Sequence, residues 1–269
     1  MGIEICEHLM PGKPQVAVFD TAFHQTMPEK AYMYAIPYHY YEEYQVRKYG
    51  FFGISCRYVS SKIQKLLPDS DTSRMIICHL GNGSNVCAVK DGKCIDTTMG
   101  LTPMEGVVMG TRSGSIDPAV VEFIEKVDNK PIGYTINTLN RKSGLLGICG
   151  HADMRDVLEA AQNGDRLAIM ARDMMIYSVQ KAIGAFVAAL NGVDVIAFSA
   201  GIGQNIPEIR KEICSAFEYL GVSIDEELNN NCFTDGVVSN DDSKVKVVVV
   251  KTNEELVIAR DTKWLIENL

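Results

Sequence analysis

The sequence lacks a long hydrophobic run and any paired-cysteine motif. Its longest strongly apolar stretch, residues 182–190, is far shorter than the roughly 18–20 residues that span a bilayer, so we expect no membrane partner. The opening residues, MGIEICEHLMPGK, contain neither an apolar signal core nor a small-residue cleavage site. The eight cysteines are scattered and form no C-x-x-C pair, which favours free thiols in a reducing compartment. These absences predict a cytoplasmic protein.

An excess of positive charge is also lacking. The chain carries 26 basic and 34 acidic residues, a net charge of -8, whereas nucleic-acid binding relies on clustered Lys and Arg. We therefore expect no nucleic-acid partner. What is present is a chain of 269 residues, 46% of them hydrophobic, which is long enough to bury a sizeable core.

The hydrophobic pattern predicts an α/β fold. Asp91-Gly92 is a strong hairpin signal between two apolar runs. The expected strands are 15–19, 75–80, 85–90, 93–97, 193–199 and 245–250, and Asp20 follows directly after the first of them. The expected long helices are 165–190 and 253–268, the second opened by the capping box Thr252-x-x-Glu255. Because the late strands look buried on both faces, we expect a mixed sheet covered by helices, an architecture typical of nucleotide-binding proteins.

Three glycine-rich segments are candidates for phosphate or anion binding. GNGS at 81–84 is explained by a hairpin turn, although its exposed amides also suit a phosphate. SAGIGQN at 199–205 follows a predicted strand and precedes Pro207, and is either a tight connection or a nucleotide-binding turn. It is neither G-x-G-x-x-G nor a P-loop. Residues 100–118 hold four glycines and a lone cation, Arg112, which suits a clamp on phosphate or carboxylate.

Two groups of side chains are candidate metal ligands. Asp20, Glu254 and Glu255 serve either as helix caps or as ligands of Mg²⁺, and their spacing does not decide between the two. Cys78, Cys87, Cys94 and His79 could form a cluster. Strand alternation instead assigns Cys78 to the core and His79 to the surface.

Together these motifs resemble the acetate kinase family of the actin-like phosphotransferase superfamily. VFDTAFH, HLGNGSN, GLTPMEGVVMGTRSG, AGIGQN and TNEEL follow one another in the family's order from near the start to near the end of the chain. The resemblance implies an actin-like (ribonuclease H-like) ATPase domain with a mixed sheet flanked by helices. It also implies a homodimer that transfers the γ-phosphoryl of ATP to acetate, giving ADP and acetyl phosphate, with Mg²⁺ (or Mn²⁺) as the cofactor.

The resemblance also implies roles for individual residues. Asp20, Arg112 and Phe52 occupy the catalytic positions, Phe52 where the family has a histidine. Glu254 matches a metal ligand, and Phe51 and Pro103 match residues that line the pocket for the acetate methyl group. The positions that match ATP contacts are His79, Leu80, Gly81, Asn82, Gly83, Asp153, Met154, Arg155, Gly201, Ile202, Gly203, Gln204 and Asn205.

Two departures from the family pattern shape the expectation for this chain. The family's opening N-x-G-S-S-S-x-K loop and its carboxylate-binding arginine have no counterpart here. We therefore expect a remnant of an N-terminal domain at 1–22, a nucleotide-binding domain at 23–252, and a helix at 253–269 that returns to the N-terminal domain. In YGFFGISC, Phe52 and Cys56 replace two histidines, and a phenyl ring cannot donate a hydrogen bond. The alternatives are an acetate kinase, a nucleotide-binding remnant with little transferase activity and, less favoured, an actin-like ATPase without a carboxylate substrate.

Overall fold

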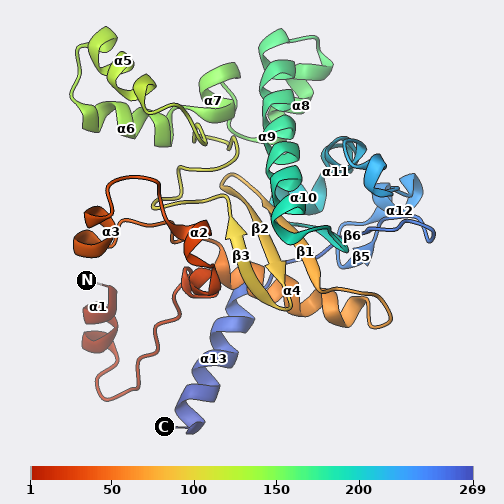
Figure 1. Ribbon diagram of the computed structural model, residues 1–269, viewed down its shortest axis with the longest axis horizontal. Helices are drawn as coiled ribbons and strands as arrows, with labels where there is room; N and C mark the ends of the chain where they lie inside the picture. The colour runs from red at the N-terminus through yellow and green to blue at the C-terminus, as the bar shows by residue number, and fades with distance from the viewer. Residues whose placement is uncertain (1, 269) are drawn as a thin grey trace.

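The core of the molecule is a mixed six-stranded sheet. The computed structural model describes residues 2–268. The strand order is β3-β2-β1-β4-β6-β5, with β1 parallel to β4, β4 parallel to β6, and antiparallel pairs elsewhere (Figure 1). The strands are β1 Arg74–Leu80, β2 Ser84–Lys90, β3 Lys93–Thr97, β4 Val195–Ser199, β5 Gly236–Val237 and β6 Lys246–Val249. The predicted mixed α/β sheet is confirmed.

The predicted hairpin joins β2 and β3. Asp91 and Gly92 have φ angles of 50° and 75°, the left-handed pair that a type I′ turn requires, and glycine adopts this conformation without strain. The turn aligns Lys90 with Lys93 and Val89 with Cys94, and the register then shifts at a bulge between Ala88 and Val89.

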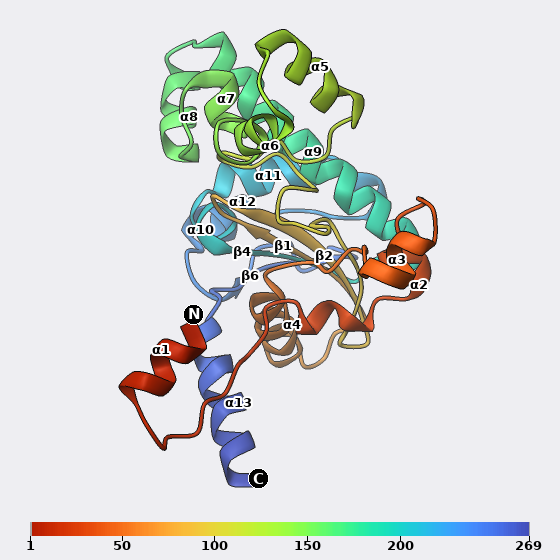
Figure 2. The same cartoon turned by 90° about the vertical axis from the view of Figure 1, so that its left-hand side faces the viewer.

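Helices cover both faces of the sheet (Figure 2). The helices are α1 Gly2–Leu9, η1 Ala22–Thr26, α2 Glu29–Tyr32, α3 His39–Tyr44, α4 Gly53–Leu66, α5 Ala119–Asp128, α6 Ile132–Arg141, α7 Gly144–Cys149, α8 Met154–Gln162, α9 Arg166–Leu190, α10 Ala200–Asn205, α11 Pro207–Ser215, η2 Glu218–Leu220, α12 Glu226–Asn231 and α13 Glu254–Asn268. Strand β1 shows how the two layers arise. Ile76 and Cys78 pack in the layer with α7–α11, whereas Met75 and Ile77 pack in the layer with α4.

The long helix α9 is a core element. Asp165 caps it by accepting hydrogen bonds from the backbone amides of Leu167 and Ala168. By length and composition it is also the one helix among the described residues that could cross a membrane. Its buried side chains, among them Val179 and Ile183, lie in the layer that packs against the sheet. This packing accounts for the apolar side chains of its buried face, whereas Met170, Met174 and Tyr177 are exposed.

Two sequence-based expectations are wrong. Residues 15–19 form no strand, and Phe19 is 67% exposed, because no strand of the sheet lies beside this segment to complete a ladder. The predicted capping box at Thr252 is also absent. Asn253 caps α13 by accepting a hydrogen bond from the Leu256 amide at 3.0 Å, and the Thr252 hydroxyl instead accepts one from Ser55.

The two terminal helices, α1 and α13, project from the side of the molecule that carries α4 (Figures 1 and 2). Helix α1 buries no residue, and in α13 only Val257 is buried. The single tryptophan, Trp264, is 64% exposed. Most large apolar side chains of these helices are therefore exposed, among them Ile3, Ile5 and Ile266.

Candidate active site

A cleft opens where β1 and β4 end. Because these strands are parallel neighbours, with His79 paired to Ser199, the turn after β1 and helix α10 after β4 meet at one edge of the sheet. The N-terminus of α8 forms the third wall. The cleft has a volume of about 670 Å³, and its lining residues are Gly81, Asn82, Ala152, Asp153, Met154, Arg155, Gly201, Ile202, Asn205 and Ile206. Three predicted nucleotide-binding segments are thus brought together by the fold.

The GNGS turn is both a hairpin and one wall of the cleft. The Gly81 amide donates to the Gly83 carbonyl at 3.1 Å, and the Ser84 hydroxyl donates to the Gly81 carbonyl at 3.0 Å. At Gly110 a Cβ would lie 1.9 Å from Asn82 Oδ1, so only glycine lets the 109–112 loop approach this turn. The role of the motif as a hairpin turn therefore does not exclude a role in binding phosphate.

Some predicted ATP-binding residues lie behind the cleft. Leu80 is fully buried in the core, and Gly203 packs against the Cys78 carbonyl. Gln204 donates through Nε2 to the Phe233 carbonyl at 2.6 Å. The segment 201–205, expected to be a turn, is the short helix α10. Its end is held by the buried Arg210, which donates to the Gly203 and Gln204 carbonyls at 3.1 and 2.7 Å.

Asp153 and Arg155 form a local unit at the start of α8. Asp153 accepts from the Arg155 amide at 2.9 Å and pairs with its guanidinium at 2.6 Å, and this pairing lowers the pKa of Asp153 to about 2. The pair is exposed at the cleft wall, so the carboxylate stays ionised under physiological conditions.

Asp20 caps helix α4. Its carboxylate accepts from the Phe52 amide at 2.7 Å and from the Ile54 amide at 3.3 Å, and its carbonyl accepts from the Gly53 amide at 2.9 Å. A Cβ on Gly53 would lie 2.2 Å from that carbonyl oxygen, so glycine is required for this approach. The aspartate that sequence reasoning placed at the end of a strand is held instead by the start of a helix.

Asp20 and Glu254 converge although they are 234 positions apart in the sequence. Glu254 is half-buried at the start of α13, and its pKa is raised by burial and then by the charges of Asp20 and Glu255. A carboxylate whose ionisation is disfavoured by a neighbouring carboxylate belongs to a donor set that a divalent cation would stabilise. The residues present therefore fit Mg²⁺.

His79 is a buried residue, which corrects the expected surface position. Its Nδ1 lies 2.8 Å from the Ser55 hydroxyl, which donates to the Thr252 hydroxyl at 2.8 Å. Burial lowers the pKa of His79 to about 4, against the opposing effect of the Asp20 charge, so the ring is neutral at pH 7. Sequence reasoning missed the roles of Ser55 and Thr252, because nothing local signals a hydrogen-bond chain across 197 residues.

Phe52 stacks on His79. The ring centroids are 4.3 Å apart at an interplanar angle of 18°, and Phe52 has a φ of 58°, which is strained for a bulky residue. A Cβ on Gly83 would lie 3.1 Å from both the Phe52 ring and Arg112 Nη1. The GNGS turn, the Phe52 ring and the Arg112 guanidinium thus meet at one point.

Arg112 has no carboxylate partner among residues 2–268. Arg112 Nη1 lies 3.9 Å from Met109 Sδ, and the Arg112 side chain is half-buried. A guanidinium without a carboxylate beside a glycine turn is suited to an anionic substrate.

Phe51 and Pro103 lie on neighbouring segments. The Phe51 carbonyl accepts from His24 Nε2 at 2.9 Å and from Asn85 Nδ2 at 3.2 Å. The Tyr49 amide donates to the Gly100 carbonyl, which draws the loop that carries Pro103 toward this segment. Both candidate substrate-pocket residues are half-buried.

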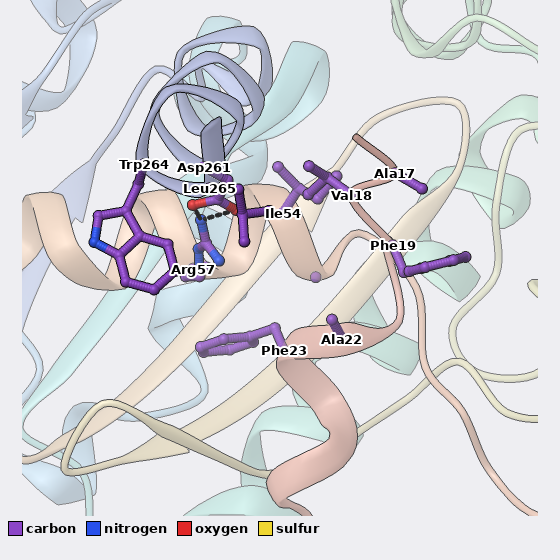
Figure 3. A pocket seen from close by; sticks show the side chains of 11 residues that line it. Ala17, Val18, Phe19, Ala22, Phe23, Ile54, Arg57, Asp261, Trp264 and Leu265 are labelled. Carbon is purple, nitrogen blue, oxygen red and sulfur yellow. Dashed lines mark hydrogen bonds and ion pairs between the residues drawn. The ribbon is translucent and has the colours of Figure 1, made fainter. Parts of the chain in front are cut away.

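A second pocket, of about 300 Å³, lies between residues 17–23, the start of α4 and α13 (Figure 3). Arg57 and Asp261 form an ion pair of 2.6 Å beside Phe23 and Trp264. Apart from this pair its labelled walls are apolar, and the nucleotide motifs do not contribute to it. This pocket carries no residue that the sequence assigned to chemistry.

Comparison with known proteins agrees with the sequence motifs. The model of the Acetokinase family matches residues 1–260. The whole chain is 52% identical to acetate kinases from Carboxydothermus hydrogenoformans and Helicobacter hepaticus, and covers 68% of each. Among solved structures, Porphyromonas gingivalis acetate kinase matches 98% of the chain at 42% identity with a TM-score of 0.93, and 67% of that protein is covered. A Francisella tularensis propionate kinase matches 96% at 45% identity with a TM-score of 0.91, with 66% of it covered.

Proposed function

The chain belongs to the acetokinase family, and we propose that it binds Mg-ATP and transfers the γ-phosphoryl to a short carboxylate, forming an acyl phosphate and ADP. The observation that carries the proposal is the cleft of about 670 Å³, whose walls come from segments 81–82, 153–155 and 201–206. Acetate is the first candidate acceptor, since the curated relatives are acetate kinases. A propionate kinase among the structural neighbours makes propionate the second.

The proposed roles follow from charge and position. Phosphoryl transfer depends mainly on positioning and on stabilising charge at the transferring group. Arg112, beside the Gly83 turn, would stabilise negative charge on that group. Asp20 and Glu254 would hold Mg²⁺, which neutralises phosphate charge when bound. Phe51 and Pro103 would contact the alkyl group of the carboxylate, and the walls of the cleft would hold the nucleoside.

A second candidate function is nucleotide binding with slow transfer, and Phe52 favours it. The side chain at this position lies beside Arg112 and the phosphate turn, and it offers no hydrogen-bond donor. Loss of one donor to a developing oxyanion costs roughly 10²–10³ in rate. We therefore expect turnover at least about 10²-fold below that of a relative with histidine here.

Two measurements on the same sample separate these functions. Calorimetry should detect Mg-ADP binding with a Kd in the micromolar to millimolar range, roughly -8 to -4 kcal/mol. Acyl phosphate is trapped as the hydroxamate with acetate, propionate or butyrate as acceptor, and the Carboxydothermus enzyme run in parallel is the reference. Binding with slow hydroxamate formation supports the second function, and near-normal turnover supports the first. Absence of Mg-ADP binding would overturn both.

Arg112→Gln tests the assigned role directly. We expect hydroxamate formation to fall by roughly 10²-fold or more while Mg-ADP affinity changes little, because the guanidinium acts on the transferring group. The matched control is Arg166→Gln, an exposed arginine in the first turn of α9. Equal activity of the two variants would contradict the role of Arg112.

We also propose that the protein is a homodimer in which another chain covers α13 and the first 20 residues. Phe19 and Trp264 are 67% and 64% exposed, and burying one such side chain is worth roughly 1.5–3 kcal/mol. Trp264 fluorescence reports on α13 alone, because it is the only tryptophan. A blue-shifted, quencher-protected emission from a strictly monomeric sample would refute this assembly.

A further inference from the structure

A cluster of soft ligand atoms lies in the core between α4 and the sheet. It combines a ring nitrogen of His24 in η1 with the thiols of Cys87 in β2 and Cys94 in β3, and these atoms all lie within 4.8 Å of one another. A fourth side chain, Cys56 of α4, lies beside the cluster, close enough to interact electrostatically with His24 and Cys87. All four residues are fully buried. Three elements therefore bring soft ligand atoms to one point, and Cys56 of a fourth element lies next to them.

The spacing of the cluster is close to that of a tetrahedral metal site. The Sγ atoms of Cys87 and Cys94 are 3.6 Å apart, and Nδ1 of His24 lies 3.2 Å from Cys94 Sγ. With Zn–S bonds of about 2.3 Å and Zn–N bonds of about 2.0–2.1 Å, tetrahedral geometry places two sulfurs about 3.8 Å apart and nitrogen about 3.6 Å from sulfur. For these two pairs of atoms, shifts of less than about 0.5 Å would give the spacing of a bound ion.

The histidine is already oriented as a ligand. Its Nε2 donates to the Phe51 carbonyl at 2.9 Å, so Nδ1 is directed at the thiols. Metal-bound histidines characteristically donate their second N–H to a carbonyl or carboxylate in this way. The same Phe51 carbonyl is held by Asn85, so the orientation of the ring is fixed from the far side.

We propose that His24, Cys87 and Cys94, with Cys56 as the fourth ligand, bind a thiophilic divalent cation of the Zn²⁺ type. The site is separate from the Asp20–Glu254 pair, whose carboxylate oxygens suit Mg²⁺. A closed four-ligand site of this kind is structural, and it ties η1 and the segment at Phe51 to the sheet. It stands or falls independently of phosphoryl transfer.

The test is metal titration of the full chain with Co²⁺ and then Zn²⁺. Co²⁺ bound by thiolates gives a near-ultraviolet charge-transfer band and tetrahedral visible absorption, which we expect to saturate at one equivalent and to disappear when Zn²⁺ displaces Co²⁺. Zn²⁺ should also raise the thermal midpoint, since a ligand that binds only the folded state stabilises it.

Variants assign the site. Cys94→Ser and Cys87→Ser should each lower Zn²⁺ affinity at least about tenfold. Replacing even a residue that only hydrogen-bonds to a metal ligand typically lowers metal affinity 10–100-fold. The matched control is Cys214→Ser, a buried cysteine in the other core layer, which should bind as the unaltered chain does. Two results would overturn the proposal: no charge-transfer band from the unaltered chain, or a band that both cluster variants retain while Cys6→Ser loses it. The first readout needs no variant to fold.

Discussion

Asn85 connects the substrate side of the candidate site to the sheet, and its removal should destabilise the protein measurably. The residue is fully buried at the start of β2. Its Oδ1 accepts from the Thr97 hydroxyl at 2.8 Å, the Thr98 hydroxyl at 2.9 Å and the Met99 amide at 3.0 Å. Its Nδ2 donates to the Phe51 carbonyl at 3.2 Å. Asn85→Ala removes all four bonds at once.

The magnitude depends on which partners keep a second bond. The Thr97 hydroxyl retains the Val86 carbonyl at 3.4 Å, and the Phe51 carbonyl retains His24. The Met99 amide is buried and is left without its acceptor, which costs about 1–3 kcal/mol, and the half-buried Thr98 hydroxyl loses about 0.5–1.5 kcal/mol more. We expect the free energy of unfolding to fall by about 2–4 kcal/mol, a large part of a typical 5–15 kcal/mol.

Urea-induced unfolding followed by far-ultraviolet circular dichroism measures this change. Asn231→Ala is the matched control, because its side chain is exposed and bonds only the Glu227 carbonyl of its own helix. The free energy of unfolding of this control should lie within about 0.5 kcal/mol of that of the unaltered protein. If Asn85→Ala unfolds at the same urea concentration as the control, the assigned network does not contribute as argued.

Three further predictions concern buried or converging charges. Arg210→Met removes the donor to the Gly203 and Gln204 carbonyls and to the side-chain oxygen of Asn229. We therefore expect the free energy of unfolding to fall by at least about 3 kcal/mol in thermal or urea unfolding, and Mg-ADP binding to be weaker by calorimetry. The pKa of Glu254 is raised in the native state, so its ionisation destabilises that state as pH rises. Glu254→Gln should therefore raise the metal-free thermal midpoint at pH 8 and abolish the response of the midpoint to Mg²⁺. An unchanged midpoint contradicts this. His79 has a pKa of about 4 in the native state against 6.5 unfolded, so unfolding takes up a proton between these values and stability should decline as pH falls from 6.5 to 4. His79→Gln should flatten that decline in acid titrations, and a decline of the same size in the variant would count against the assignment.

The sequence by itself determined the features that depend on neighbouring residues. Asp91-Gly92 sets the β2–β3 hairpin because its two left-handed φ angles are a local requirement. Asp165 caps α9 with its own side chain, which is also a local interaction, and the continuous apolar runs of β4 and β6 indicate burial on both faces. The motif strings identified the family because they are contiguous in the chain.

Tertiary structure alone decided the features that depend on distant partners. Residues 15–19 have the composition of a strand, but a strand exists only where another lies beside it to complete the ladder. His79 is buried because Ser55 and Phe52 cover it, and Thr252 bonds Ser55 instead of capping α13. The periodicity of a segment shows which of its faces are apolar. It carries no information about which distant segment of the chain will pack against them. For that reason the convergence of His24 with Cys87 and Cys94, across 70 positions of sequence, became visible only once the chain was folded.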